Sequence, residues 1–257
     1  MAESDNCVAA CNGKCFSPSQ YTAPLANIKS AAFVMGMVLD SYYVKDYTVQ
    51  QYIDRTNDYL DLFANDVDIW EIGNEVNGNW LGDISDVVAK VEGAYAAVKA
   101  KGKKTALNLY YNAPCYYGQS EYEMFNWINA NLTEELRHGL DYVFFSYYED
   151  DCNNVVPTKA QWQAVFEQLH ALFPQAKLGF GEVGSNKCSK KRAYMRRYYH
   201  ELEIQGEYFV GGYFWWYYRQ DCVPKSKPLW DALENGTPGD NTCKAPKSLF
   251  PIIQTLL

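Results

Sequence analysis

The sequence predicts an α/β protein of the (β/α) TIM-barrel type, incomplete, with about six βα units. The first observation is an alternation along the chain, in which apolar runs of about seven to ten residues take turns with amphipathic stretches of about sixteen. This alternation is typical of a parallel sheet whose strands are joined by helices. The second observation is that polar side chains close several of the apolar runs, where the C-terminal ends of parallel strands would lie.

Each element follows from its own pattern. Runs rich in aromatic and branched apolar residues predict strands over 31–39, 67–74, 104–111, 140–148, 176–182 and 208–218. Apolar residues with the helical period predict helices over 48–64, 84–101, 120–137, 158–173 and 189–205. Thr158 and Gln161 form the pattern of a capping box, which supports the start of the fourth helix.

The composition predicts one domain with a neutral ligand. The 257 residues are 48% hydrophobic and 21% charged, which is enough for one large core. Because no linker divides them, we expect a single domain over 1–257, with 1–30 as an N-terminal segment pinned by cysteines. The net charge of −8 argues against nucleic acid and against an anionic membrane surface as partners. No apolar run approaches the length of a membrane span.

Eight cysteines, an even number, predict disulfides and therefore a secreted, extracellular protein. The N-terminus is too polar for a signal peptide, so we expect that any export signal has been removed. Four cysteines follow successive predicted strand ends, which predicts the disulfides Cys115–Cys152 and Cys188–Cys222. The remaining four lie near the termini and would restrain them: Cys7, Cys11, Cys15 and Cys243. A zinc site at the first three is the competing interpretation, but the spacing lacks a second ligand pair.

Two of the apolar runs end on a glutamate, Glu75 and Glu182. A single glutamate at a strand end is usually solvated or caps a helix. A pair of carboxyl groups that meet in a sugar-sized cleft, however, is what glycoside hydrolysis requires. Since 107 residues separate these two, they can meet only through the tertiary fold. We therefore expect both at the C-terminal rim of the sheet, the face that carries the chemistry in parallel barrels.

These residues resemble a known family. A strand that ends in Asn-Glu, with a second glutamate closing a later strand, is similar to the clan A retaining glycoside hydrolases, which include the family 5 cellulases, mannanases and xylanases. In that group the glutamates close strands that lie three apart, as Glu75 and Glu182 do here. The resemblance implies that Glu75 is the general acid/base, that Glu182 is the nucleophile, and that Asn74 hydrogen-bonds the sugar 2-hydroxyl.

The resemblance extends to two aromatic positions. Tyr148 is the first choice, and Tyr147 the second, for the tyrosine that hydrogen-bonds the nucleophile in that group. Either Trp215 or Trp216 would form the floor under the sugar, but not both, because side chains alternate between the faces of a strand. Two further residues, on the loop after Glu75, are candidates for a more distant subsite: Asn77 and Trp80.

The N-terminal part departs from the family. Only one clear strand precedes Glu75, so the first two strands are missing or replaced, and no counterpart is found for the arginine that usually supports the nucleophile. Asp40, at the end of the first clear strand, is expected to line the site instead. An incomplete barrel has two exposed edges, which predicts a homodimer through those edges.

The predicted function is that of a retaining β-glycosidase acting on a neutral polysaccharide or oligosaccharide, with endo attack favoured by an open cleft. No metal or cofactor is expected, since no sequence motif for one occurs. The alternative is a non-catalytic carbohydrate-binding relative, in which the aromatic floor still binds sugar. An α/β scaffold without a sugar function is a third class, because a fold alone does not specify function.

Overall fold

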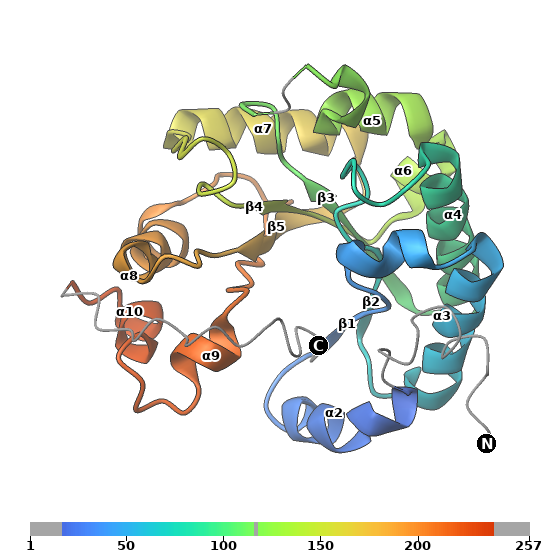
Figure 1. Cartoon of the computed structure of the whole chain (residues 1–257), viewed down its shortest axis with the longest axis horizontal. Helices are drawn as coiled ribbons and strands as arrows, with labels where there is room; N and C mark the ends of the chain where they lie inside the picture. The colour runs from blue at the N-terminus through green and yellow to red at the C-terminus, as the bar shows by residue number, and fades with distance from the viewer. Residues whose placement is uncertain (1–16, 116–117, 239–257) are drawn as a thin grey trace.

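The chain folds into a curled, five-stranded parallel half-barrel. The computed structural model describes residues 17–115 and 118–238. The strands are hydrogen-bonded in sequence order and all neighbours are parallel. Their bounds are β1 (Met35–Met37), β2 (Ile69–Gly73), β3 (Lys104–Tyr110), β4 (Tyr142–Tyr147) and β5 (Lys177–Val183). The predicted incomplete α/β barrel is confirmed, and Figure 1 shows the sheet curling inside an outer layer of helices.

Helices follow the strands in the predicted alternation. They are α2 (Thr22–Lys29), α3 (Val49–Phe63), α4 (Ile84–Ala100), α5 (Met124–Asn131), α6 (Glu134–Gly139), α7 (Lys159–Leu172), α8 (Cys188–Arg196), α9 (Tyr218–Cys222) and α10 (Trp230–Asn235). Short 3-10 turns span Pro18–Tyr21, Ser41–Asp46 and Ser120–Tyr122, and a π-helical turn, Arg197–Glu201, extends α8. The predicted capping box of Thr158 and Gln161 starts α7. None of the helices in 17–115 and 118–238 is long and apolar enough to cross a bilayer.

Two predicted elements differ from the structure. The helix expected over 120–137 is divided, because Leu132 is extended and the Thr133 hydroxyl caps a new helix at the Leu136 N–H. The strand expected over 208–218 is reduced to two isolated parallel bridges to β5, at Phe209 and Trp215. Between these bridges Gly211 and Gly212 have φ of 81° and 67°, a left-handed backbone that interrupts a strand.

The core lies between the convex side of the sheet and the helices. In Figure 1 the helices α3 to α7 cover this outer side. Phe145 of β4 illustrates the packing, since its ring contacts Trp162 and Phe166 of α7 and Phe180 of β5 at centroid distances of 4.9–5.7 Å. Such large buried rings contribute most of the burial free energy of a core. Apolar side chains therefore fill the convex side, and polar side chains gather on the concave side.

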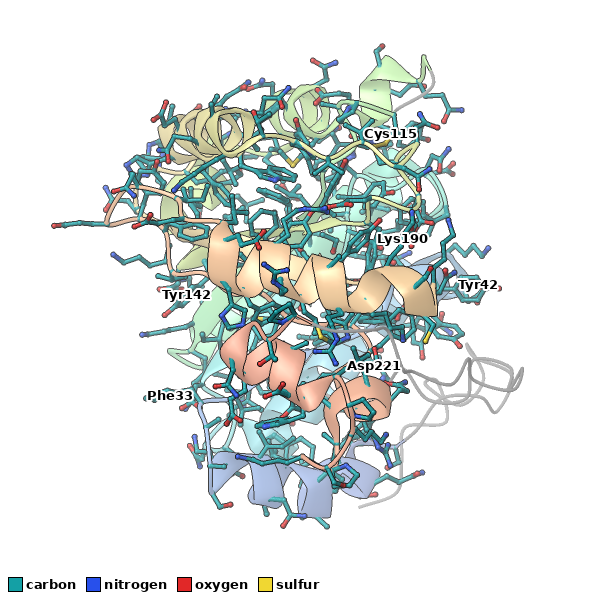
Figure 2. All side chains as sticks on the ribbon, turned by 90° about the vertical axis from the view of Figure 1, so that its left-hand side faces the viewer. Phe33, Tyr42, Cys115, Tyr142, Lys190 and Asp221 are labelled. Carbon is teal, nitrogen blue, oxygen red and sulfur yellow. A yellow bond between two sulfur atoms is a disulfide. The ribbon has the colours of Figure 1, made fainter. Side chains whose placement is uncertain are left out.

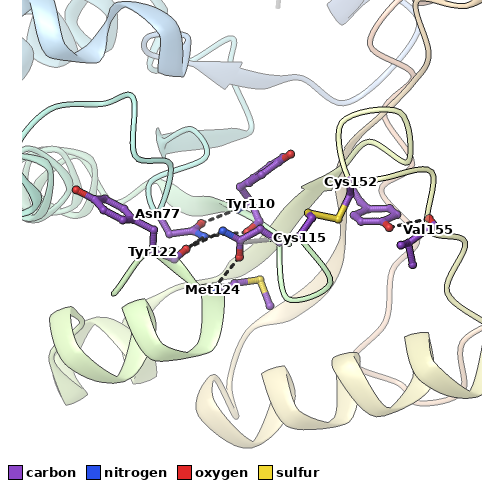
Figure 3. The surroundings of a disulfide bond; sticks show 9 residues. Asn77, Tyr110, Cys115, Tyr122, Met124, Cys152 and Val155 are labelled. Carbon is purple, nitrogen blue, oxygen red and sulfur yellow. Dashed lines mark hydrogen bonds between the residues drawn. A yellow bond between two sulfur atoms is a disulfide. The ribbon is translucent and has the colours of Figure 1, made fainter. Parts of the chain in front are cut away.

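One of the two predicted disulfides is confirmed. Cys115 and Cys152, with Cα atoms 5.2 Å apart, join the loops after β3 and β4 (Figure 3). The prediction of Cys188–Cys222 is wrong. Cys222 is a free thiol at the end of α9, fully buried in the core, whereas Cys188 is bonded to a different cysteine. Burial raises the pKa of the Cys222 thiol to about 12. The predicted cysteines Cys7, Cys11, Cys15 and Cys243 lie outside the described residues.

Candidate functional site

A pocket of about 210 Å³ lies at the C-terminal ends of the strands. Its walls come from the segments that follow β1, β2, β4 and β5. A further wall comes from residues 213–218, called the aromatic segment, which lie after α8 in the sequence. The lining residues are mostly polar: Asp40, Ser41, Asn74, Glu75, Tyr148, Asp150, Asp151, Glu182, Gly184, Ser185, Asn186, Trp216 and Tyr217. Thus Glu75 and Glu182, distant in sequence, share one cavity, as the sequence predicted.

The end of β2 is irregular in a way that serves the pocket. The pairing of β2 with β3 shifts by one residue between Glu71 and Gly73, which marks a β-bulge. The bulge offsets the strand alternation, so that Glu71 and Asn74, three residues apart, are hydrogen-bonded to each other on the concave side. Glu75 follows with φ of 48°, a left-handed backbone that a glutamate rarely adopts. Strained backbone of this kind clusters at functional sites.

Glu182 is held on both of its oxygens. Asn74 Nδ2 donates to Glu182 Oε1 at 2.8 Å, and the Tyr148 hydroxyl donates to Oε2 at 2.6 Å. The strand is bulged here too, because Phe145 pairs with Phe180 while Ser146 pairs with Glu182. The extra residue is Gly181, where a Cβ atom would lie only 2.2 Å from Asn108 Oδ1. Any larger residue immediately before the candidate nucleophile would therefore displace the Asn108 side chain.

Glu75 has a different set of partners. Its Oε2 accepts a hydrogen bond of 2.9 Å from the Ser41 hydroxyl. Ser41 is placed by two further contacts, since its N–H donates to Asn74 Oδ1 at 2.9 Å and its hydroxyl accepts from Trp80 Nε1 at 3.2 Å. The loop after β1 thus supplies the donor that orients the carboxyl at the end of β2.

The surroundings of the two carboxyls affect their pKa values differently. Burial, followed by the charge of Glu182, raises the pKa of Glu75 well above its ordinary value. Burial also raises the pKa of Glu182, but the hydrogen bonds from Tyr148 and Asn74 oppose that shift and hold it at about 7. The two donors on Glu182 therefore favour its ionisation before that of Glu75.

Most of the predicted site residues line the pocket. They are Asp40, Asn74, Glu75, Tyr148, Glu182 and Trp216. Tyr148, the first choice for the tyrosine that contacts Glu182, makes that contact. Trp80 lies just behind the wall, where its indole donates to Ser41.

Three predicted site residues point elsewhere. Tyr147 faces the core, where its hydroxyl donates to the Val155 carbonyl at 2.8 Å. Trp215 is 4% exposed and its indole donates to Asp221 at 2.9 Å. The prediction that Asn77 builds a subsite is corrected by its contacts, because its side-chain amide binds the backbone of Tyr110 and Tyr122 (Figure 3). These hydrogen bonds use both ends of the amide, and the side chain is fully buried.

Several residues that line the pocket or lie directly behind its wall were missed by sequence reasoning. Ser41 directly follows the predicted Asp40, and its position after a strand end was the available signal. Glu71 is a charged residue inside an apolar strand, and it was overlooked because regular alternation gives no reason to group it with Asn74. The others lie on the loops after β4 and β5 or at the aromatic segment: Asp150, Asp151, Gly184, Ser185, Asn186 and Tyr217. No arginine is among the described residues that line the pocket.

Comparisons with known proteins assign no family. No protein-family model matches the chain, and no curated protein matches it. A solved structure of tryptophan synthase from M. tuberculosis, in an open form with BRD0059 bound, aligns at 16% sequence identity. The alignment covers 75% of this chain and 88% of that chain, with a TM-score of 0.28. A likeness this weak carries no argument about function, so the function must be inferred from the pocket itself.

Proposed function

We propose that this protein is a retaining β-glycosidase that hydrolyses O-glycosidic bonds of a neutral polysaccharide or oligosaccharide by double displacement. The observation that carries the proposal is the pair of buried carboxyls in one pocket, Glu75 with a strongly raised pKa and Glu182 with two hydrogen-bond donors. An acid that keeps its proton beside an ionised nucleophile is the combination that this reaction needs.

In the first step Glu182 attacks the anomeric carbon while Glu75 gives its proton to the departing glycosidic oxygen. The bond from carbon to that oxygen breaks, the leaving sugar departs as an alcohol, and an ester joins the sugar to Glu182. With the charge of Glu182 removed, one cause of the raised pKa of Glu75 disappears, so Glu75 ionises. Glu75 then takes a proton from water, which attacks the same carbon, releases Glu182 and leaves the configuration retained.

The remaining pocket residues fit a sugar. Trp216 and Tyr217 offer aromatic surface beside the carboxyls, and a pyranose has an apolar C–H face that packs on such rings. Asp40, Ser41 and Asn186 offer polar atoms for hydroxyl groups around the ring. The open side of the half-barrel favours a long chain passing through, and hence endo attack.

We also propose that the protein works outside the cell. The disulfide Cys115–Cys152 supports this location, because disulfides persist in oxidising compartments.

The first test is hydrolysis of a panel of β-glucans, mannans, xylans and galactans, followed by release of reducing ends. We expect Glu182→Gln and Glu75→Gln to abolish release, whereas Glu92→Gln, at an exposed glutamate of α4, retains it. On the substrate identified, NMR of the first product gives its anomeric configuration. Inversion would refute double displacement.

Azide separates the roles of the two carboxyls. In Glu75→Ala, azide can attack the glycosyl ester without a general base, so it should restore turnover and give a β-glycosyl azide. In Glu182→Ala, azide should replace the nucleophile and give the α-anomer. The opposite pairing of anomers would exchange the two assignments.

The alternative function is non-catalytic carbohydrate binding. The observation that favours it is the pocket wall without an arginine, since the resemblance predicts one in support of the nucleophile. Calorimetric titration with the same glycans tests it. Binding by wild type and Glu182→Gln alike, with no product from either, would identify a binding protein.

A further inference from the structure

A third carboxyl, Glu71 of β2, lies beside the pair and has no part in the mechanism above. Its side chain is only 2% exposed. The charged groups that act on it are Glu182 and Asp40, which are both acidic. A buried carboxyl group beside two acidic neighbours is costly to ionise, so its presence calls for a role.

Glu71 is connected to Glu182 through a single side chain. Asn74 Nδ2 has two hydrogens, and it donates to Glu71 Oε1 at 2.9 Å and to Glu182 Oε1 at 2.8 Å. The other end of the same amide, Oδ1, accepts from the Ser41 N–H at 2.9 Å. If the amide turned over, its oxygen would face two carboxyl oxygens, and the Ser41 N–H would face a donor. These contacts fix which way round the amide lies.

We propose that Glu71 is a positioning residue, which holds the Asn74 amide so that one N–H stays on the Glu182 nucleophile. The inference rests on the proposed function, because that function makes Glu182 the nucleophile. Glu71 touches neither the sugar nor the reacting atoms and acts only through Asn74.

The role requires a protonated Glu71. An ionised Glu71 would compete with Glu182 for Asn74 and would add a second negative charge beside the nucleophile. Burial, followed by the charge of Glu182, raises the pKa of Glu71 to about 8. The titratable groups that face it are Glu182 of β5, Asp40 of the loop after β1, and Tyr52 of α3. The charges of Glu182 and Asp40 oppose its ionisation, whereas the hydrogen bonds from Asn74 and Asn108 favour it.

The first experiment needs no substrate. The side-chain NH2 signals of Asn74 are identified in ¹⁵N-labelled protein by their loss in Asn74→Ser and followed against pH. Besides a change near pH 7 from Glu182, which all variants share, we expect wild type to show an inflection near pH 8 that is absent from Glu71→Gln and present in Glu92→Gln. An Asn74 signal without that inflection, or one that persists in Glu71→Gln, overturns the inference whatever the protein hydrolyses.

The second experiment compares two substitutions on the glycan that wild type hydrolyses. Gln keeps a neutral group that accepts from Asn74, so Glu71→Gln should stay within about threefold of wild type in kcat. Glu71→Ala removes one of the three groups that hold the amide, and kcat should fall about tenfold to a hundredfold, with KM changed less than threefold. Equal losses in both variants, or a loss confined to KM, overturn the positioning role.

The two failures are distinguishable. If no glycan is hydrolysed, the proposed function fails, and the positioning of a nucleophile fails with it, even where the Asn74 inflection is found. If hydrolysis is found but Glu71→Gln and Glu71→Ala behave alike, only the present inference fails. Thermal melting of each variant shows whether Glu71→Ala is folded, and Glu71→Gln decides the question if it is not.

Discussion

Two identical carboxyl groups acquire different properties at the rim of this sheet because different donors surround them. Glu182 accepts from Tyr148 and Asn74, while Glu75 accepts from Ser41. Hydrogen bonds to an ionised group stabilise it, so Glu182, the carboxyl with two donors, loses its proton first. The hydrogen bonds of the free protein thus support the proposal that Glu182 is the nucleophile and Glu75 the acid.

Removing the tyrosine hydroxyl should move the acidic limb of the activity profile. In wild type we expect kcat/KM to fall as the pH drops through about 7, where Glu182 takes up its proton. Tyr148→Phe loses a hydrogen bond that favours the carboxylate, so the limb should move to higher pH by about one to two units. Tyr147→Phe is the matched control, since its hydroxyl faces the core. An unmoved limb in Tyr148→Phe would exclude the Tyr148 contact as a determinant.

The buried acid Glu71 should weaken the fold at alkaline pH. Its folded pKa of about 8 is raised above the ordinary value of 4.5 for a glutamate, so its contribution to stability is lost as the pH rises through that interval. Glu71→Gln avoids this loss. By pH 9 the variant should gain about 4 kcal/mol relative to its position at pH 4, or roughly 10 °C in Tm. Melting curves across pH, with Glu92→Gln as control, would refute this if the difference stayed constant.

At this scale, the sequence predicted the residues that close strands and missed those that depend on irregular backbone. Glu75, Glu182, Asn74 and Tyr148 were found because each sits at a strand end, and all four line the pocket. The bulge that turns Glu71 toward Asn74 has no signature in the sequence. Nor does the sequence reveal that Tyr110 and Tyr122 occupy the amide of Asn77.

Among the elements, the aromatic segment beside β5 shows how the fixed position of one residue determines the orientation of the next. The side chain of Trp215 is held by Asp221, which accepts a hydrogen bond from its indole. Asp221 is held in turn by an ion pair of 2.7 Å with Lys191 of α8. Figure 2, viewed from the side of α8, shows Asp221 beneath that helix. With Trp215 buried, Trp216 faces the pocket. The sequence predicted that only one of the two would do so, because side chains alternate along a strand, and it left open which one.

The two tryptophans should separate binding from stability. Trp216→Ala removes an aromatic face worth about 1.5 kcal/mol, so KM should rise about tenfold with little change in Tm. Trp215→Phe removes the indole donor to Asp221, which keeps only Lys191, and should cost about 1 kcal/mol of stability, with KM nearly retained. Kinetics and melting curves of both variants test this. The reverse pattern would place Trp215 in the site.

The rim disulfide should contribute strongly to stability. Cys115 and Cys152 are separated by 37 residues. In the chain-entropy account a closed loop of this size stabilises by about 3–4 kcal/mol. The double substitution Cys115→Ala with Cys152→Ala should therefore lower Tm by roughly 10 °C. An unchanged melting curve would show that the linked loops are held by packing alone.

For the whole molecule, the half-barrel leaves two edges, at β1 and at the segment beside β5. Phe33, just before β1, is 87% exposed and projects from the surface in Figure 2. We therefore predict a homodimer, with a mass by light scattering near twice the 29.4 kDa of one chain. Phe33→Lys should shift the mass toward one chain, and the exposed Leu62→Lys on α3 should not. A monomeric wild type would contradict the prediction.

The order of strands and helices was more predictable from the sequence than the exact extent of each element. Alternating patterns gave five strands and the order of the main helices, since parallel strands joined by helices leave a strong periodic signal. The sixth strand failed at Gly211 and Gly212, and one helix was divided at Leu132, where local backbone preferences prevailed over periodicity. The pairing of Cys188 depended on contacts that no local pattern encodes.

The curl of the sheet also has a consequence for heat sensitivity. β2 and β5 are three strands apart, so in a flat sheet roughly 14 Å would separate them, farther than an asparagine, a glutamate and one hydrogen bond can span. The hydrogen bond from Asn74 to Glu182 exists only because the sheet bends. The geometry of the site therefore depends on the curvature of the sheet. We expect warming that relaxes the bend to break this hydrogen bond while the helices and strands are still intact.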